Sequence, residues 1–171
     1  MSDAQPSPGA ASPSGAKPAE ELRPLINVMS QYVKDFSFEN PNAPASLQLA
    51  STQPEIKVNV AVNAEALKDG TFEVVLHVSA TAQSGETIAF VTDLIYAGQF
   101  GVTNASREML PAILLIECPR MLFPFARRVI ADATRDGGFP PLLLSPIDFV
   151  ALVRQQRMTA QGQPAQAAPT A

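Results

Sequence analysis

Two prolines five residues apart, Pro119 and Pro124, lie inside a stretch whose apolar spacing otherwise suits one long helix. Proline lacks a backbone N–H and crowds the preceding turn, so each of them should start, kink or break a helix. Beyond Pro124 the helical spacing resumes, with Phe125 and Ile130 among its apolar positions. We therefore predict a long, proline-interrupted helical segment from about 105 to 136.

The pair Gly137–Gly138 should end this segment, because glycine tolerates the left-handed conformation that caps helices. Pro140–Pro141 then prevents the helix from restarting. A shorter helix should follow, since Ser145 is a suitable N-cap, Pro146 fits the first helical position and Asp148 places an acid three residues after the cap.

Four segments before these helices have the composition or the alternation of β-strands. In the fourth, Ile88, Phe90, Leu94 and Tyr96 belong to the apolar face. Short turns between the later segments imply antiparallel pairing. The segments span residues 25–39, 56–63, 72–81 and 88–96.

Strands that come first and helices that follow are typical of an α+β fold. One face of the sheet is apolar and needs cover, which only the helical second half can supply, and the mixed face can meet water or a partner. We therefore predict a four-stranded antiparallel sheet packed against the long helix and a shorter C-terminal helix. The connection from 40 to 54 shows no periodicity, and loops of this length are uncommon unless they have a function.

Residues 1–24 are rich in Pro, Ala and Ser, and residues 158–171 in Gln, Ala and Pro, so both should be disordered tails. The folded domain is then 25–157. The N-terminal residues lack the cationic start and apolar run of a signal peptide, and no apolar run is long enough to span a bilayer. We therefore expect a cytoplasmic protein.

The formal net charge of −4 argues against a nucleic-acid partner, which needs a basic footprint, but permits a basic protein partner. Catalytic chemistry is not indicated. His77 is the only histidine and has no metal partner at ligand spacing. Cys118 is either a packed thiol or one activated by Arg120 or a helix start. Because no phosphate loop or dinucleotide fingerprint occurs either, we predict no catalytic residues, no metal site, no cofactor and no enzyme activity.

An acidic set and a surplus of apolar surface indicate binding instead. Asp35 and Glu39 on the first strand, and Asp93 on the fourth, would share the mixed face if those strands are neighbours. Such a patch would steer a basic partner, although ordinary solvated charge explains it as well. The surplus apolar surface is either a groove for another chain or a contact between subunits.

Two motifs resemble the SecB family of protein-export chaperones. They are C-P-R-x-L-F-P-F-A-R at 118–127 and G-G-F-P-P-L-x-L-x-P-I-D-F at 137–149, and the similarity is collinear from about 25 to 156. The resemblance implies a homotetramer, a dimer of dimers, in which the long helices form much of the subunit contact. It also implies a holdase that keeps unfolded secretory precursors in apolar grooves without ATP and delivers them to the translocation ATPase SecA.

The resemblance assigns residues to both surfaces. Those that match the family's ATPase-contacting positions are Asp35, Glu39, Val91 and Asp93. Candidates for the client groove are Phe38, Leu47, Phe139, Leu142, Phe149 and Leu152. The chain departs from the family in its N-terminal extension and in a C-terminal tail without acidic residues, which puts a contact between that tail and the ATPase in doubt.

Two other functions would suit the same sequence. A general holdase, or one linked to a toxin–antitoxin pair, would share the fold and the groove but not the use of the acidic face. A carrier of small apolar ligands would instead need an enclosed pocket.

Overall fold

A computed structural model of the chain describes residues 23–162. It has the predicted α+β fold, with four strands first and helices after them. The predicted tails, 1–24 and 158–171, lie largely outside the described residues, although the last helix continues to Gly162. In chain order the elements are β1 (Leu25–Glu39), the 3-10 helix η1 (Ala45–Thr52), β2 (Glu55–Ala66), β3 (Phe72–Ser84), β4 (Thr87–Thr103), α1 (Leu110–Ala112), the π-helix η2 (Ile113–Glu117), α2 (Cys118–Asp136) and α3 (Phe149–Gly162).

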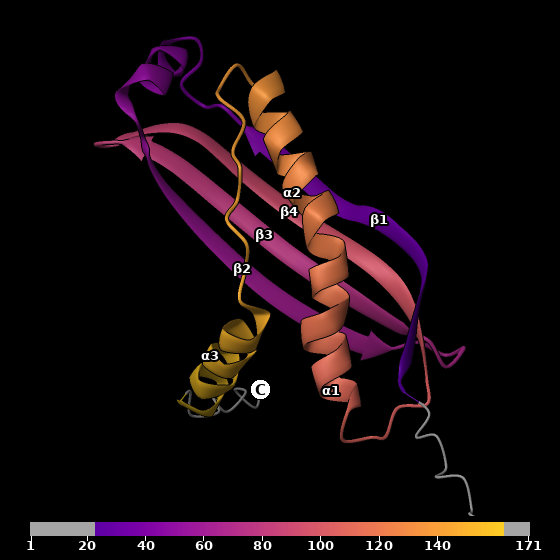
Figure 1. Cartoon of the computed structure of the whole chain (residues 1–171). Helices are drawn as coiled ribbons and strands as arrows, with labels where there is room; N and C mark the ends of the chain where they lie inside the picture. Colours follow the sequence, from indigo (N-terminus) through magenta and orange to yellow (C-terminus); the bar gives the residue numbers. More distant parts are fainter. Residues whose placement is uncertain (1–22, 163–171) are drawn as a thin grey trace, which may run out of the picture.

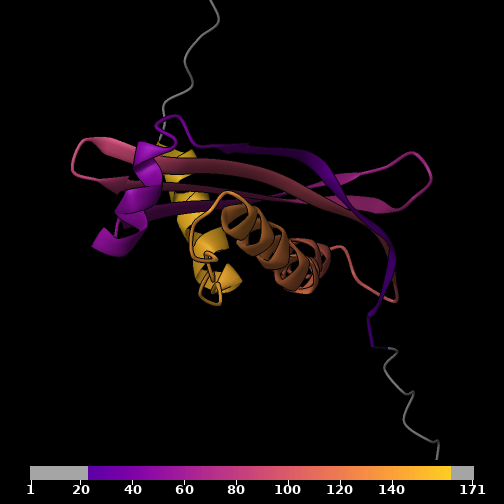
Figure 2. The same cartoon turned by 90° about the horizontal axis from the view of Figure 1, so that it is seen from above.

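The four strands form one antiparallel sheet in the order β1-β4-β3-β2. Turns join β2 to β3 and β3 to β4, whereas β1 pairs with the far side of β4. Helices α2 and α3 lie on the same side of the sheet (Figures 1 and 2). We call the face on the helix side the inner face and the opposite one the outer face.

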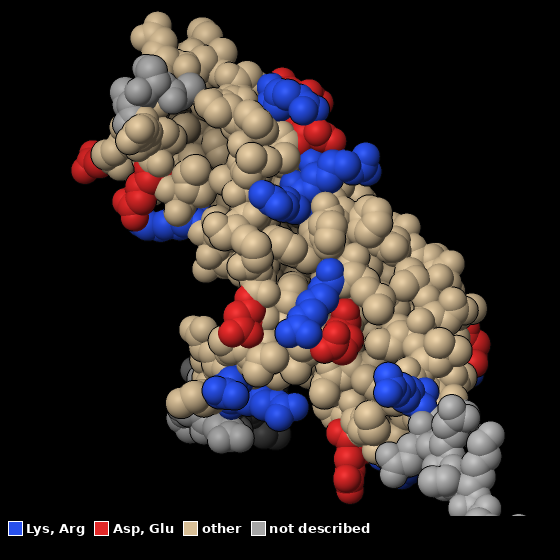
Figure 3. Space-filling model, viewed as in Figure 1, with Lys and Arg blue, Asp and Glu red and all other residues tan. Residues whose placement is uncertain are grey.

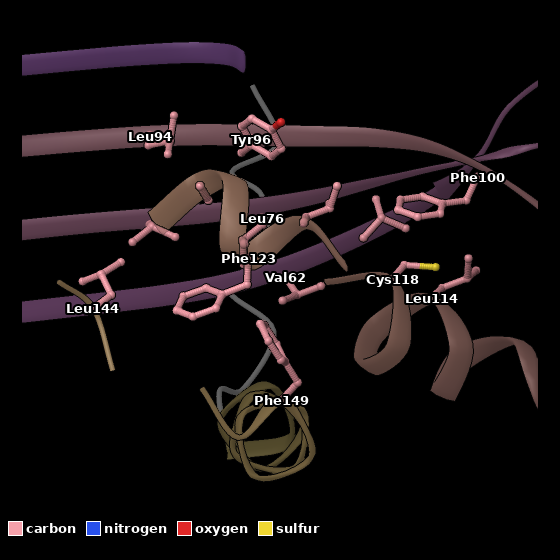
Figure 4. Close-up of a cluster of buried hydrophobic side chains, with 14 of the residues drawn as sticks. Val62, Leu76, Leu94, Tyr96, Phe100, Leu114, Cys118, Phe123, Leu144 and Phe149 are labelled. Carbon is pink, nitrogen blue, oxygen red and sulfur yellow. The ribbon is translucent and has the colours of Figure 1, made fainter. Parts of the chain in front are cut away.

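The inner face and the long helix enclose one apolar core. Val74 and Leu76 of β3 and Leu122 of α2 are completely buried. Phe123 of α2 meets Phe149 of α3 edge to face, with ring centroids 6.2 Å apart (Figure 4). Full burial of side chains of this size stabilises the fold by about 1.5–3 kcal/mol each, so this layer holds helix and sheet together.

The alternation of side chains between the inner and outer faces is interrupted at one position of β4. Phe90 pairs with Ala82 but Ile88 pairs with Gln83, so Ala89 is an extra residue in the ladder. A one-residue bulge reverses the side-chain alternation beyond it. The prediction that Ile88 shares the apolar face with Phe90 is therefore wrong, and Ile88 lies partly exposed on the outer face.

The helix continues through both prolines. Cys118 N–H bonds to the carbonyl of Ile113, five residues back, so the turns before Pro119 widen into η2. A widened turn of this kind accommodates a residue that cannot donate a backbone hydrogen bond. Pro119 stands in the first turn of α2, as expected of a proline that starts a helix, whereas Pro124 lies inside α2 without ending it. Regular helix begins at Leu110 rather than near 105.

The connection between β1 and β2 is more regular than predicted. Residues 40–54 contain the 3-10 helix η1, whose Leu47 lies against Gly138, just beyond the end of α2. That end is at Gly137–Gly138, as predicted, and Gly138 has φ +87°. A Cβ atom at Gly138 would lie 2.9 Å from Leu47 Cδ2, so this glycine also allows η1 to approach the helix.

Asp148, not Ser145, caps the last helix. Its Oδ1 accepts hydrogen bonds of 3.0 Å from the backbone N–H groups of Val150 and Ala151. α3 therefore begins at Phe149, later than predicted. An aspartate side chain satisfies the free donors of a first helical turn as well as a serine does, and so both were acceptable caps on sequence alone.

We predict that Gly98→Ala lowers the free energy of unfolding by about 1–3 kcal/mol. The added Cβ would lie 2.8 Å from Leu122 Cδ2 and 2.9 Å from Phe100 Cε2, and both of these side chains are completely buried. Urea denaturation would measure the change. Gly101→Ala is the matched control, because its nearest neighbours are 3.9 Å away. Equal stabilities of the two variants would contradict this account of the helix–sheet contact.

Candidate binding surfaces

The predicted docking residues form one patch on the outer face. β1 lies beside β4, where Glu39 pairs with Val91 and Asp35 with Ile95. Asp93 lies between Val91 and Ile95 on the same face of β4. This face is the outer one, because the alternate residues of β4 are buried in the core. The condition set by the sequence, that the two strands are neighbours, is therefore met.

A bulge in β1 decides which residues reach this patch. The pairing shifts between Val33 and Asp35, so Lys34 is the extra residue. Tyr32 faces outward, and strict alternation from it would turn Asp35 inward. The bulge instead brings Asp35 to the outer face and Phe38 to the inner face.

The bulge is anchored by a buried carboxylate. Glu73 of β3 is 7% exposed and accepts hydrogen bonds from the Tyr32 hydroxyl and, at 2.6 Å, from Lys34 Nζ. These bonds raise the pKa of Tyr32 to about 12, raise the pKa of Lys34 and lower the pKa of Glu73. A carboxylate this buried needs such partners. Sequence reasoning missed the cluster, because Tyr32 and Glu73 are 41 positions apart and no local motif joins them.

His77 is the partner of Asp93. Its Nε2 lies 3.0 and 2.9 Å from the two carboxylate oxygens, across adjacent strands. Both side chains are close to half exposed, so the pair belongs to the solvent-facing surface of the patch. Among the described residues, no three His, Cys, Asp or Glu side chains are grouped as metal ligands.

Four of the six predicted groove residues gather at one end of the molecule, where η1 meets the end of α2. They are Phe38, Leu47, Phe139 and Leu142. Phe90 joins them, with its ring centroid 5.7 Å from that of Phe38 and 5.1 Å from that of Phe139. Sequence reasoning did not name Phe90 as a groove residue, although its place on the apolar face was a usable signal.

The other two predicted groove residues lie at the start of α3. Phe149 is 1% exposed and belongs to the core. Leu152 lines a cleft of about 520 Å³ between α3 and β2, together with Val58 and Val60. Leu142 packs against both apolar clusters, so apolar side chains run from η1 to α3.

Exposed apolar side chains border this strip. Ile56 and Val58 on β2 are each 42% exposed, Leu47 is 39% exposed and Leu143 is 63% exposed. The predicted helical cover of the inner face is therefore incomplete at the β2 edge. On the helix side many of the charged residues follow α2, and the surface over η1 and the 137–148 connection is mostly uncharged (Figure 3).

Cys118 is a packed thiol. It is completely buried, and burial together with the nearby Glu117 raises its pKa to about 12. A thiol this hard to ionise is a poor nucleophile, which removes the alternative of an activated cysteine. Within residues 23–162 no helix is both long and apolar enough to cross a membrane.

Comparisons with known proteins agree on one family. The sequence model described as "Preprotein translocase subunit SecB" matches residues 19–160. A "Protein-export protein SecB" from Rhodopseudomonas palustris strain BisB5 is 52% identical over 152 residues, which cover 88% of this chain and 96% of the relative. Another from Xanthobacter autotrophicus is 50% identical over 150 residues, which cover 88% of this chain and 96% of that relative.

A solved structure is similar in fold. It is the SecB-like chaperone Rv1957 of Mycobacterium tuberculosis, in complex with a ChAD peptide from the HigA1 antitoxin. The TM-score is 0.57 at 16% sequence identity, and the match covers 71% of this chain and 90% of that one.

Glu73→Gln should lower the free energy of unfolding by about 1–3 kcal/mol at pH 7, because two charge-assisted hydrogen bonds are weakened. The bonds from Lys34 and Tyr32 hold the pKa of folded Glu73 below its ordinary value of 4.5. The contribution of Glu73 is thus present above about pH 4.5 and is lost as the pH falls through the folded-state pKa. Urea denaturation at several pH values should show the two proteins converging in acid.

The control is Glu86→Gln, which changes an exposed side chain in the turn between β3 and β4. Its stability should stay within about 0.5 kcal/mol of the wild type at every pH. A difference between Glu73→Gln and wild type that grows in acid would show that Glu73 does not anchor the bulge as a carboxylate.

Proposed function

This chain belongs to the SecB family of protein-export chaperones, and we propose that it holds unfolded secretory precursors without ATP and delivers them to a SecA-type translocation ATPase. The observation that carries the proposal is the separation of two surfaces on β1. Asp35 and Glu39 lie on the outer face and Phe38 on the inner face of the same strand. One chain can therefore hold a client and meet the ATPase at the same time.

Client binding would use the apolar strip from η1 to α3. Each Å² of apolar surface removed from water contributes about 25 cal/mol. Ordering an unfolded client takes back part of that gain, so many shallow contacts hold diverse sequences and still release them. The half-exposed side chains along the strip, such as Leu47 and Leu143, suit contacts of this kind.

ATPase docking would use the outer face. The carboxylates of Asp35, Glu39 and Asp93 would attract a basic surface of the ATPase and orient it. The ATPase would then give export its direction, because this chain supplies only reversible binding. We propose no catalytic residue, metal or cofactor, and a cytoplasmic location that lets the chain meet precursors before export.

Assembly into a homotetramer, a dimer of dimers, would cover apolar surface that a single chain leaves open. Met121 and Phe125 of α2 are 38% and 43% exposed on the helix side. On β1, Leu25 and Met29 are 62% and 54% exposed. Exposure of this extent on a regular helix and an edge strand favours contact with further copies.

A general or antitoxin-linked holdase would have the same groove. The outer face separates the two functions, because only the export chaperone needs its carboxylates for the ATPase. A small-ligand carrier differs in another way: its bound dye or lipid would not be displaced by unfolded polypeptide.

Charge reversal of Asp35, Glu39 and Asp93 to Lys should abolish binding to the SecA-type ATPase of the same organism, because it replaces attraction by repulsion. Binding of an unfolded polypeptide should be unchanged, since the substituted residues are on the opposite face. Isothermal titration calorimetry with each partner measures both. Reversing Glu55, Glu86 and Glu108 makes the same change in net charge at other exposed sites and should leave ATPase affinity intact. If the first triple variant binds the ATPase as tightly as wild type, the outer face is not the docking site.

Leu47→Ser should weaken the affinity for an unfolded, carboxymethylated polypeptide about 3- to 10-fold, because it removes apolar contact at the η1 end of the strip. Leu67→Ser is matched to it, since Leu67 is 36% exposed and Leu47 is 39% exposed, but Leu67 lies in the turn after β2. Native mass spectra would give the stoichiometry and show a tetramer that takes up the unfolded polypeptide but not its folded form. Equal losses in the two variants would refute the placement of the groove.

A further inference from the structure

One titratable pair of the outer face lies outside the apolar core. His77 of β3 and Asp93 of β4 stand on adjacent strands, and the Nε2 atom of His77 is 3.0 and 2.9 Å from the two carboxylate oxygens. Neither residue belongs to the apolar clusters that hold helix and sheet together. Their side chains are 45% and 42% exposed, so protons from the solvent reach the pair directly.

This pair changes its charge near neutral pH. Histidine is the side chain whose ordinary charge change falls between about pH 5 and 8, and His77 is the only histidine of the chain. The neutral imidazole ring carries its proton on one nitrogen, whereas the imidazolium ring donates from both. Protonation therefore places a charge-assisted hydrogen bond from Nε2–H on the Asp93 carboxylate.

The pair lies among the carboxylates of the docking patch. His77 pairs with Ile95 of β4, and Ile95 pairs in turn with Asp35 of β1. Neighbouring strands are about 4.8 Å apart, so the backbones of His77 and Asp35 are roughly 10 Å apart. A positive charge on His77 would thus touch Asp93 and lie within about one screening length of Asp35.

The other elements around His77 bring no charged group into contact with it. On β2 its partner is Ala61, and α3 contributes the neutral Gln156 to the hollow of about 370 Å³ beside it. The nearest charged side chains of β2 and β3 on the outer face are each four residues from this row, roughly 13 Å along the strand, and they are Lys57, Glu65 and Glu73.

Two of these distant groups are already paired. Lys57 lies 3.7 Å from a carboxylate oxygen of Glu55, and Glu73 is 2.6 Å from Lys34 Nζ. Among the described residues around the pair, Asp93 is therefore the carboxylate that responds most to the charge of His77. A basic partner would compete with the imidazolium for it, because a carboxylate that is already paired attracts a second cation less strongly.

We propose that His77 makes docking on the outer face dependent on pH: its protonation occupies Asp93 and weakens the hold on a basic partner, and its deprotonation frees Asp93 again. This rests on the proposed docking function and adds a regulation to it. Affinity should rise with pH as the imidazolium loses its proton. Linkage requires the reverse as well, so that docking releases a proton from His77 to the solvent.

The test compares wild type with His77→Gln, whose amide still donates a hydrogen bond to Asp93 but does not titrate. The full chain is titrated calorimetrically with the SecA-type ATPase of the same organism at about pH 5.5 and about pH 8. Wild type should bind about 2- to 5-fold more weakly than the variant at the lower pH and equally well at the higher one, because the pair is half exposed and its coupling is modest. The ratio of the two affinities cancels the titration of the ATPase itself.

A double-mutant cycle assigns the effect to Asp93. In an Asp93→Asn background, His77→Gln should change the ATPase affinity by the same factor at both pH values, because no carboxylate is left for the imidazolium to occupy. Titrations in two buffers of different ionisation enthalpy count the protons released on docking. Near pH 6.5 wild type should release more protons than His77→Gln does.

His77→Arg tests the same pair in the opposite direction. It keeps a cation on Asp93 at every pH and should hold the affinity near the low-pH value of wild type. Lys57→Gln is the control, since it removes a charge from the outer face at a site away from the patch. Its effect on ATPase affinity should be the same at both pH values.

Each outcome separates the regulation from the docking function. If the affinities of wild type and His77→Gln fall equally in acid, His77 does not regulate the patch, and the docking function stands. If neither protein binds the ATPase at either pH while both still bind an unfolded polypeptide, the docking function and its regulation are both rejected. Wild-type affinity of His77→Arg at about pH 8 would also overturn the regulation.

Discussion

The pairing of β1 with β4 is the constraint on which both proposed surfaces depend. β1 is joined to β4 along its whole length, and the bulge at Lys34 sets the face of every residue beyond it. If the pairing shifted by one residue, Asp35 would turn to the inner face and Phe38 to the outer face. The Glu73 carboxylate opposes such a shift. It accepts hydrogen bonds from Tyr32, which precedes the bulge, and from Lys34, the extra residue of the bulge, and it is too buried to remain unpaired.

The long helix explains where apolar surface is left for other chains. α2 crosses the inner face closely enough that Leu122 reaches the backbone at Gly98. One helix cannot cover four strands, and the shortest of these, β2, still has 12 residues. Its edge therefore keeps Ile56 and Val58 exposed, and the helix itself keeps Phe125 exposed. If this chain assembles with further copies, as we propose, these are the positions at which we expect client and subunit contacts.

The sequence predicted the acidic patch only on the condition that the first and fourth strands are neighbours. Alternation placed Asp93 on the mixed face, but whether Asp35 joins it depends on β1 lying beside β4 rather than beside β2. No local pattern carries that information, because the two strands are separated by the rest of the sheet in sequence. His77 illustrates the same limit: it was assigned correctly to a strand, while its bond to Asp93 follows from a cross-strand register that the sequence does not display.

The sequence by itself determined the order of the four strands and of the two main helices, the apolar face of β3, the end of α2 at Gly137–Gly138 and the family to which the motifs belong. These depend on periodicity and on backbone preferences of single residues, which act over a few positions. The tertiary structure decided the bulges at Lys34 and Ala89, the 3-10 helix after β1 and the start of α3 at Phe149. At each of these positions the local sequence allows more than one structure, and packing against residues distant in the chain selects among them.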